Sequence, residues 1–196
     1  LIKKAAAIAN GELACIPKDI SDAIVQATNE ILAGSLRDQF VVDVYQAGAG
    51  ASHHMNMNEV LANRALEILG ESKGDYSRVS PNDHVNYGQS TNDVIPTAIR
   101  VGGILALEHS LYPALEGAIA TVKAKAVEFQ AVVRSGRTHM QDAVPVRRGE
   151  GFRAWEHILT AHQTRIRTAA DELAVLGLGG SATGTGLDTH PNYRFR

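Results

Sequence analysis

The sequence predicts an all-α protein that is built as a helix bundle. Its clearest apolar patterns repeat with helical period, and no block alternates apolar and polar residues as a strand does. Aromatic residues make up only 5% of the chain. The longest periodic segment is a narrow apolar seam of the kind that packs against partner helices.

The first two helices are predicted from apolar stripes that end at glycines. One stripe consists of Ile20, Ala23, Ile24, Ala27 and Ile31. Gly34 follows it, at the place where a glycine commonly stops a helix. A second stripe consists of Met57, Leu61, Ala65, Ile68 and Leu69, and it ends at Gly70.

Two further helices are predicted in the second half of the chain. Residues 93–111 are apolar on most sides, so we expect a helix that is buried in something larger than itself. Residues 152–173 place apolar side chains at alternating spacings of three and four, as in a heptad seam. A helix of that length extends about 33 Å and needs partners along its seam. The sequence therefore predicts a bundle that completes itself by oligomerising.

Composition excludes several classes of function. A net charge of -2 gives no electrostatic reason to expect nucleic acid or an anionic membrane surface as a partner. The single cysteine, Cys15, excludes an intrachain disulfide and fits a reducing cytoplasm. No uninterrupted apolar run approaches the roughly 20 residues that span a bilayer, so we expect no membrane segment. Both ends look like cuts, which indicates a fragment of a longer protein.

A polar segment precedes the apolar helix and ends in Ser90, Thr91 and Asn92. These residues lie at a predicted helix N-terminus, where free backbone N–H groups and the helix dipole favour a carboxylate or a phosphate. Helix capping alone also explains them, because serine, threonine and asparagine are preferred caps. The residues by themselves leave both interpretations open.

The histidines allow two kinds of site. His139 lies among hydrogen-bonding neighbours and is either an acid/base group or carboxylate partner, or a structural histidine. His53 and His54 are adjacent, so on an extended chain they point to opposite faces and do not bind one ion together. No second cluster has ligand spacing, and we therefore expect no metal site.

Five segments together resemble the fumarase/aspartase superfamily, in the expected order and over essentially the entire chain. The segments are Ile2–Ala7 with Asn10–Leu13, Gly48–Val60, Pro81–Asn86 with Gln89–Asp93, Gly136–His139 with Gln141–Ala143, and Leu178–Leu187. The resemblance implies a helical homotetramer whose active sites are each assembled from three subunits. It also implies a reversible elimination from a four-carbon dicarboxylate that gives fumarate, without a cofactor. Residues 1–90 would be the N-terminal helical domain, and residues 91–196 the start of the central bundle domain.

The resemblance also assigns roles to residues. It implies that Ser90, Thr91 and Asn92 hold a substrate carboxylate or the leaving group. Thr138 lines the same site, with His139 as the catalytic acid/base residue or a substrate partner. The matching segments further imply substrate contacts at Gly50, Ala51 and Ser52, and a secondary anion site at Pro81, Asn82 and Asp83.

Three departures from the family pattern bear on activity. Ala51 stands where the family usually has a hydroxyl residue, and the pair Glu150-Gly151, after Arg148, replaces a usual Gln-Glu pair at a helix start. The family's loop with the serine base does not occur before Arg196, so we expect no lyase activity from these residues alone.

The substrate is predicted from smaller likenesses. Segments such as Asp43–Gln46 and Lys73–Tyr76 look more like aspartases than fumarases, which favours L-aspartate over L-malate. The resemblance leaves a class II fumarase as the alternative enzyme. A non-catalytic helical relative remains a third possibility.

Overall fold

The computed structural model describes residues 1–196 and confirms the all-α fold class. The α-helices are α1 (Ile2–Glu12), α2 (Lys18–Leu32), α3 (Ala51–Ile68), α4 (Thr91–Ala106), α5 (Tyr112–Glu128) and α6 (Arg148–Leu173). Short helical turns are η1 (Arg37–Gln39), η2 (Pro81–Val85), η3 (Leu107–Leu111) and η4 (Tyr193–Phe195). The strands are β1 (Val133–Thr138) and β2 (Gln141–Arg147). The chain forms two compact units, residues 1–99 with 176–196 and residues 100–175.

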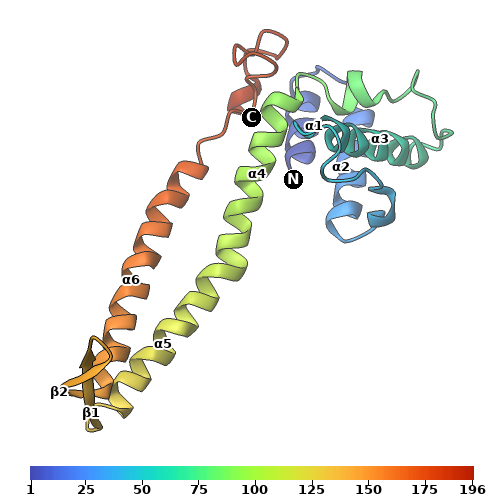
Figure 1. The fold of residues 1–196 in the computed structure, drawn as a ribbon. Coiled ribbons are helices and arrows are strands. Elements are labelled where there is room, and N and C mark those ends of the chain that lie inside the picture. The colour runs from blue at the N-terminus through green and yellow to red at the C-terminus, as the bar shows by residue number, and fades with distance from the viewer. The chain divides into compact units, whose positions relative to one another are not determined.

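The first unit is organised around α1, α2 and α3, which lie together in Figure 1. Its core contains Ile20 and Ile24 from α2 and Leu61 and Leu66 from α3, all nearly or fully inaccessible to solvent. Both stripes predicted from the sequence therefore face this core. The predicted glycine stops are confirmed, because Gly34 and Gly70 have φ angles of +102° and +80° just after their helices.

The C-terminal segment 176–196 belongs to the first unit because it packs on α1 and on the start of α4. Tyr193 is buried against Ala6 and Ala9 of α1. Its hydroxyl has no partner, and burial raises the pKa of Tyr193 to about 12. The sequence-based domain boundary between residues 90 and 91 stays a prediction about the complete fold, whereas the compact units of this chain divide within α4.

In the second unit, α5 and α6 run side by side and are joined by the two strands (Figure 1). Phe152 of α6 stacks on Phe129 at 5.5 Å between ring centroids and contacts Trp155 edge-on at 5.4 Å. The helix over residues 152–173 is thus confirmed. Its seam is largely open in this chain, since Trp155 remains 57% exposed and Gly149 is the one buried residue of α6.

Helix α4, the π-helical turn η3 and α5 form one continuous helical segment, Thr91–Glu128. Its 38 residues and a window of mean hydropathy 1.2 would suit a membrane crossing by length and composition alone. This candidate differs from the sequence-based expectation of no membrane segment. The expected burial is not met within this chain, because only 11% of that window is buried.

The sequence predicts no strand, and for residues 136–145 this expectation is wrong. β1 and β2 form an antiparallel hairpin in which Thr138 pairs with Gln141. The two residues between the strands, His139 and Met140, have φ angles of +52° and +58°, as a tight two-residue turn requires. Gly136 and Pro145 resemble loop residues in sequence. Gly136 instead lies where the strand register shifts, and an added Cβ there would come within 2.7 Å of the Val144 carbonyl oxygen.

Candidate functional site

The start of α4 is held by a reciprocal capping arrangement. The Ser90 hydroxyl accepts a hydrogen bond from the Asn92 backbone N–H at 3.2 Å, and the Asp93 carboxylate accepts one from the Ser90 N–H at 2.9 Å. Ser90 therefore has the capping role that the sequence left open. The arrangement satisfies the N–H groups of Asn92, Asp93 and Val94 and fixes the direction of the first turn of α4.

The start of α3 lies directly beside the start of α4. Gly50, at the N-cap of α3, has a φ angle of +83°, and an added Cβ would meet the Ile95 side chain at 3.0 Å. One turn further along α3, the His54 ring nitrogen Nδ1 lies 2.9 Å from the Thr91 hydroxyl. Two helix N-termini therefore converge, and both predicted motifs, residues 50–52 and 90–92, belong to the same region of the first unit.

A buried ammonium group lies behind this contact. The Lys3 Nζ atom donates to Asn86 Oδ1 and Gln89 Oε1, each at 2.9 Å, and lies 2.7 Å from His54 Nε2. Lys3 is only 5% exposed, and burial lowers its pKa to about 7, although the Asp93 carboxylate opposes that effect. Burial, followed by the neighbouring Lys3 charge, lowers the pKa of His54 to about 4, so the imidazole is neutral at pH 7.

Asp93 joins the C-terminal loop to the start of α4. Its second carboxylate oxygen accepts hydrogen bonds from the backbone N–H groups of Gly179 and Ser181, each at 3.0 Å. The Asn92 side-chain amide donates to the Ala182 carbonyl oxygen at 2.8 Å. The glycine-rich segment 177–189 is therefore part of the candidate site.

The predicted secondary anion site forms a separate local structure. Pro81, Asn82 and Asp83 begin the turn η2, which Ser80 caps by accepting from the N–H groups of Asn82 and Asp83. Pro81 is buried, whereas Asn82 and Asp83 are exposed. None of these three residues has a basic side chain that would attract an anion. Their anion-binding role stays a prediction.

Thr138 and His139 belong to the other compact unit. Thr138 ends β1, and His139 occupies the hairpin turn with an exposed side chain. The positive-φ turn at His139 and Met140 is held by the strand pairing and by an ion pair between Arg137 and Asp142 at 3.0 Å. The predicted meeting of His139 with residues 90–92 therefore stays a prediction.

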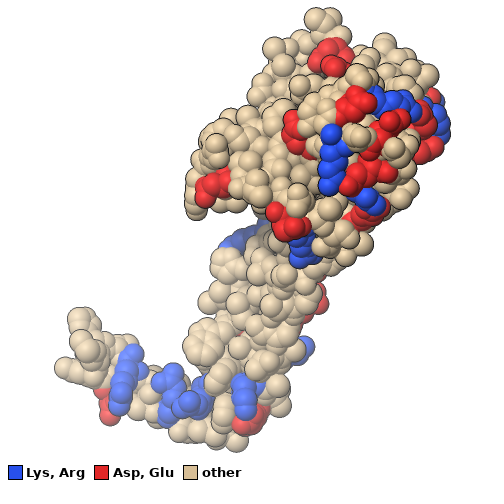
Figure 2. Space-filling model, turned by 90° about the vertical axis from the view of Figure 1, so that its right-hand side faces the viewer, with Lys and Arg blue, Asp and Glu red and all other residues tan.

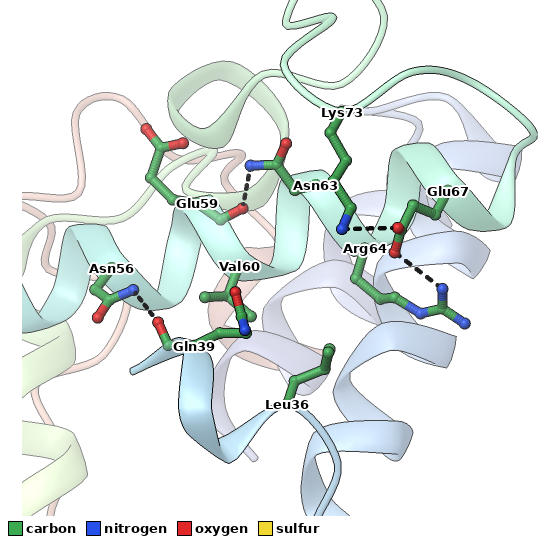
Figure 3. A pocket seen from close by; sticks show the side chains of 9 residues that line it. All are labelled: Leu36, Gln39, Asn56, Glu59, Val60, Asn63, Arg64, Glu67 and Lys73. Carbon is green, nitrogen blue, oxygen red and sulfur yellow. Dashed lines mark hydrogen bonds and ion pairs between the residues drawn. The ribbon is translucent and has the colours of Figure 1, made fainter. Parts of the chain in front are cut away.

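A surface pocket of the first unit is a weaker candidate for an anion site than the region where α3 and α4 begin. It has a volume of about 450 Å³, and its lining includes Arg64, Glu67 and Lys73 (Figure 3). The two basic side chains of the pocket already form ion pairs, since Arg64 contacts Glu67 at 3.0 Å and Lys73 contacts Glu67 at 2.9 Å. Figure 2 shows acidic and basic side chains interspersed on one face of the first unit. No three His, Cys, Asp or Glu side chains gather in a metal-binding group.

Sequence reasoning missed Lys3, His54 and Asp93 as components of the site. A signal for two of them was present. Lys3 shares a helical stripe with the buried residues Ala6, Ala7 and Asn10. His54 lies on the same stripe of α3 as the buried Asn58, Leu61 and Ala65. A polar residue at a core position of a helical stripe needs a buried partner, and such partners mark a network.

Comparisons with known proteins show which family the chain belongs to. The sequence pattern of a family described as "Lyase" matches residues 1–196. The chain is 51% identical to a class II fumarate hydratase of Halobacterium salinarum over 98% of its own length. It is 49% identical, over 98% of its length, to an aspartate ammonia-lyase of Bacillus subtilis. A solved structure described as a fumarate lyase:delta crystallin from Brucella melitensis bound to cobalt superposes with a TM-score of 0.93 at 46% identity, covering 98% of this chain and 42% of that one.

The chain spans less than half the length of the relatives that it matches. The chain covers 41% of the Halobacterium protein and 40% of the Bacillus protein, although nearly all of its own residues are matched. The superposed structure shares the helical architecture of this chain. The chain belongs to the fumarase/aspartase superfamily of lyases.

Proposed function

We propose that these residues are the N-terminal and early central part of an aspartate ammonia-lyase. The complete enzyme would remove ammonia reversibly from L-aspartate and release fumarate. The observation that carries the proposal is the convergence of the α3 and α4 N-termini, where Gly50 packs on Ile95 and Thr91 meets His54. Oriented backbone N–H groups and a half-buried hydroxyl form a region suited to a carboxylate.

Such a region fits the chemistry of elimination. Removal of a proton from the carbon next to a carboxylate turns that carboxylate into an enediolate with additional negative charge. Fixed donors that meet this charge lower the barrier, because they need no reorganisation during the reaction. The Thr91 hydroxyl would supply such a donor, and the positive end of the α4 dipole would add to its effect. The Ser90 hydroxyl and the Asn92 amide already have partners and would mainly shape the site.

The remaining components would come from outside the first unit. We propose that His139 is an acid/base residue or substrate partner and that Thr138 lines the same site. The serine base is expected in a segment that follows residue 196 in the complete protein. The open seam of α6, with Trp155 57% exposed and Ile158 49% exposed, supports assembly with further helices into a homotetramer. We place the enzyme in the cytoplasm, with no cofactor.

A class II fumarate hydratase is the second candidate. Its support is the 51% identity to the Halobacterium fumarate hydratase, which slightly exceeds the 49% identity to the Bacillus aspartate ammonia-lyase. Both reactions share fumarate and the enediolate, so the donors at α4 serve either one. The leaving group is the difference between the two candidates.

The decisive experiment compares two substrates in one enzyme. The full-length protein would be assayed with L-aspartate and L-malate side by side, and fumarate would be followed by its ultraviolet absorbance. Faster turnover of L-aspartate is expected, whereas a preference for L-malate would select the second candidate. Turnover of neither would favour a non-catalytic relative. The 196-residue chain is the matched negative control, and we expect it to form no fumarate.

A pair of variants tests the contribution of the α4 terminus. Thr91→Val removes the hydroxyl at nearly constant volume, and Thr91→Ser retains it. We expect the valine variant to lose about 10–100-fold in kcat/KM, the size of a hydrogen bond to a charged group, while the serine variant stays within a few fold of wild type. Equal activity of the two variants would remove Thr91 from the site.

A further inference from the structure

Three residues connect the interior of the first unit to the proposed carboxylate site. Lys3 of α1, His54 of α3 and Thr91 of α4 form an unbroken series of contacts, at 2.7 Å between Lys3 Nζ and His54 Nε2 and at 2.9 Å between His54 Nδ1 and the Thr91 hydroxyl. Lys3 and His54 are 5% and 3% exposed, whereas Thr91 is half-buried. The series therefore begins in the protein interior and ends at a group that a ligand can reach.

The direction of the first hydrogen bond follows from the acceptors around Lys3. The side-chain amide nitrogen of Asn86 donates to the backbone carbonyl oxygen of Gln89 at 3.2 Å. The side-chain amide nitrogen of Gln89 donates to the backbone carbonyl oxygen of Val85 at 3.1 Å. Both amide nitrogens are thereby occupied, so both amide oxygens face Lys3. The ammonium group has three protons and no lone pair. Its third proton therefore goes to His54 Nε2, which must be the bare nitrogen of the ring.

The second hydrogen bond follows from the first. A neutral imidazole carries one proton, and with Nε2 bare that proton resides on Nδ1. His54 is neutral at pH 7 because burial lowers its pKa to about 4. The Nδ1–H group then donates to the Thr91 oxygen. Since Thr91 accepts on the protein side, its own hydroxyl proton is free to point toward a ligand.

We infer that Lys3 and His54 are positioning residues that orient the Thr91 hydroxyl as a donor to a substrate carboxylate. The inference rests on the proposed function, because it specifies how that site recognises a carboxylate. The opposite tautomer would direct an Nε2–H group at the ammonium and would let Thr91 donate its proton to His54. In that state the hydroxyl would offer a carboxylate only lone pairs, which repel it.

The charged surroundings set the pH of the experiment. Asp93 of α4 is the acidic group that acts on both Lys3 and His54, and its attraction partly offsets the burial of each. Lys3 has a pKa of about 7 and His54 a pKa of about 4. Between these two values Lys3 is charged and His54 neutral, which is the state that the inference requires.

The first test is a double-mutant cycle on ligand binding in the full-length protein, within that pH window. The probe is succinate, a dicarboxylate without a leaving group, and calorimetry measures its affinity. We expect His54→Gln to weaken binding about 10-fold and Thr91→Val to weaken it by at least that factor. The double variant should bind no more weakly than Thr91→Val alone, because His54 acts only through Thr91.

Matched controls separate positioning from general damage. His53→Gln changes the exposed neighbour of His54 on the same helix, and Lys4→Met controls for Lys3→Met. Both controls should bind succinate as wild type does, while Lys3→Met should weaken binding as His54→Gln does. The inference would be overturned if the double variant lost succinate affinity by the product of the two single losses of His54→Gln and Thr91→Val. It would also be overturned if His53→Gln weakened succinate binding as much as His54→Gln.

The second test needs no variant and so does not depend on whether one folds. Solid-state nitrogen-15 NMR of histidine-labelled wild type identifies His54 as the ring that titrates near its pKa of about 4. We expect a protonated Nδ1 on that ring. A protonated Nε2 together with normal succinate binding would overturn this inference alone. Failure of wild type to bind succinate would overturn the proposed site and this inference with it.

Discussion

The two compact units differ in how far each satisfies its own packing. In the first unit, Ile24, Leu61 and Leu66 are completely buried by elements of the same chain. In the second unit, α6 buries only Gly149, and Trp155 and Ile158 remain open to solvent. The first unit therefore provides its own core, and it also holds the buried polar network beside the candidate site. The second unit leaves the apolar seam of α6 exposed to solvent.

The difference also concerns polar groups. Asp93 and Lys3 are 4% and 5% exposed, and each makes three hydrogen bonds within the first unit. In the second unit the charged contacts lie at the surface, as between Arg167 and Glu116 at 3.1 Å, with both side chains at least half exposed. Buried polar groups fix one arrangement because alternatives leave them unsatisfied, whereas exposed pairs contribute little.

The largest expected effect tests the first unit at Asp93. Asp93→Ala removes an acceptor from three backbone N–H groups, two of them in the loop 177–189. We expect a loss of about 3–5 kcal/mol in the free energy of unfolding, measured in urea, and faster proteolytic release of residues 176–196. Asp188→Asn is the control, because the Asp188 side chain accepts only from the Ser181 hydroxyl. Equal stability of the two variants would contradict the anchoring role of Asp93.

Two substitutions to alanine, one in each unit, test the contrast in packing. Leu61→Ala opens a cavity at a position with 0% exposure, so we expect a loss of about 2–5 kcal/mol in the free energy of unfolding. Ile158→Ala, at 49% exposure, should cost less than about 1 kcal/mol in the 196-residue chain. In the full-length protein the same Ile158 variant should weaken assembly, as measured by light scattering. An unaffected assembly would break the comparison between the units.

The pH dependence of stability follows from His54. Its pKa is about 4 in the folded chain and about 6.5 when the ring is free, so the unfolded chain takes up the proton first. The stabilisation is complete above the free value and is lost as the pH falls from 6.5 toward 4. We expect wild type to lose about 3 kcal/mol more than His54→Gln over that interval. His53→Gln should retain the wild-type slope, and a flat wild-type profile would contradict the burial of His54.

The smallest expected effect lies in the hairpin of the second unit. Met140 is 98% exposed and has a φ angle of +58°, which costs energy for any residue with a Cβ. Met140→Gly should therefore slow hydrogen exchange in β1 and β2 and add up to about 1 kcal/mol of local stability. Met140→Ala keeps the Cβ and is the control. Faster exchange in the glycine variant would show that the turn is not strained.

The helices of this chain could be predicted from sequence because their signals are local. Ile20, Ile24 and Gly34 are sufficient to place α2, since the stripe and the stop lie within one segment. The hairpin was missed because strand pairing joins residues such as Val133 and Arg147, and no local pattern announces that contact. In the same way, the motif around Thr91 was recognised, whereas the contact of Lys3 with His54 spans 51 positions.

The π-helical turn η3 has a consequence for the design of variants. A π-turn accommodates one residue more than an α-helical turn of the same rise, and each residue advances the helix by about 100°. Every side chain of α5 is thus rotated by roughly that angle from the direction that an unbroken α-helix would give it. Deleting one residue within Leu107–Leu111 would hardly shorten the helical segment, but it would rotate the side chains of α5 about the helix axis. The stripe that α5 offers to its neighbours would then be an entirely different set of residues.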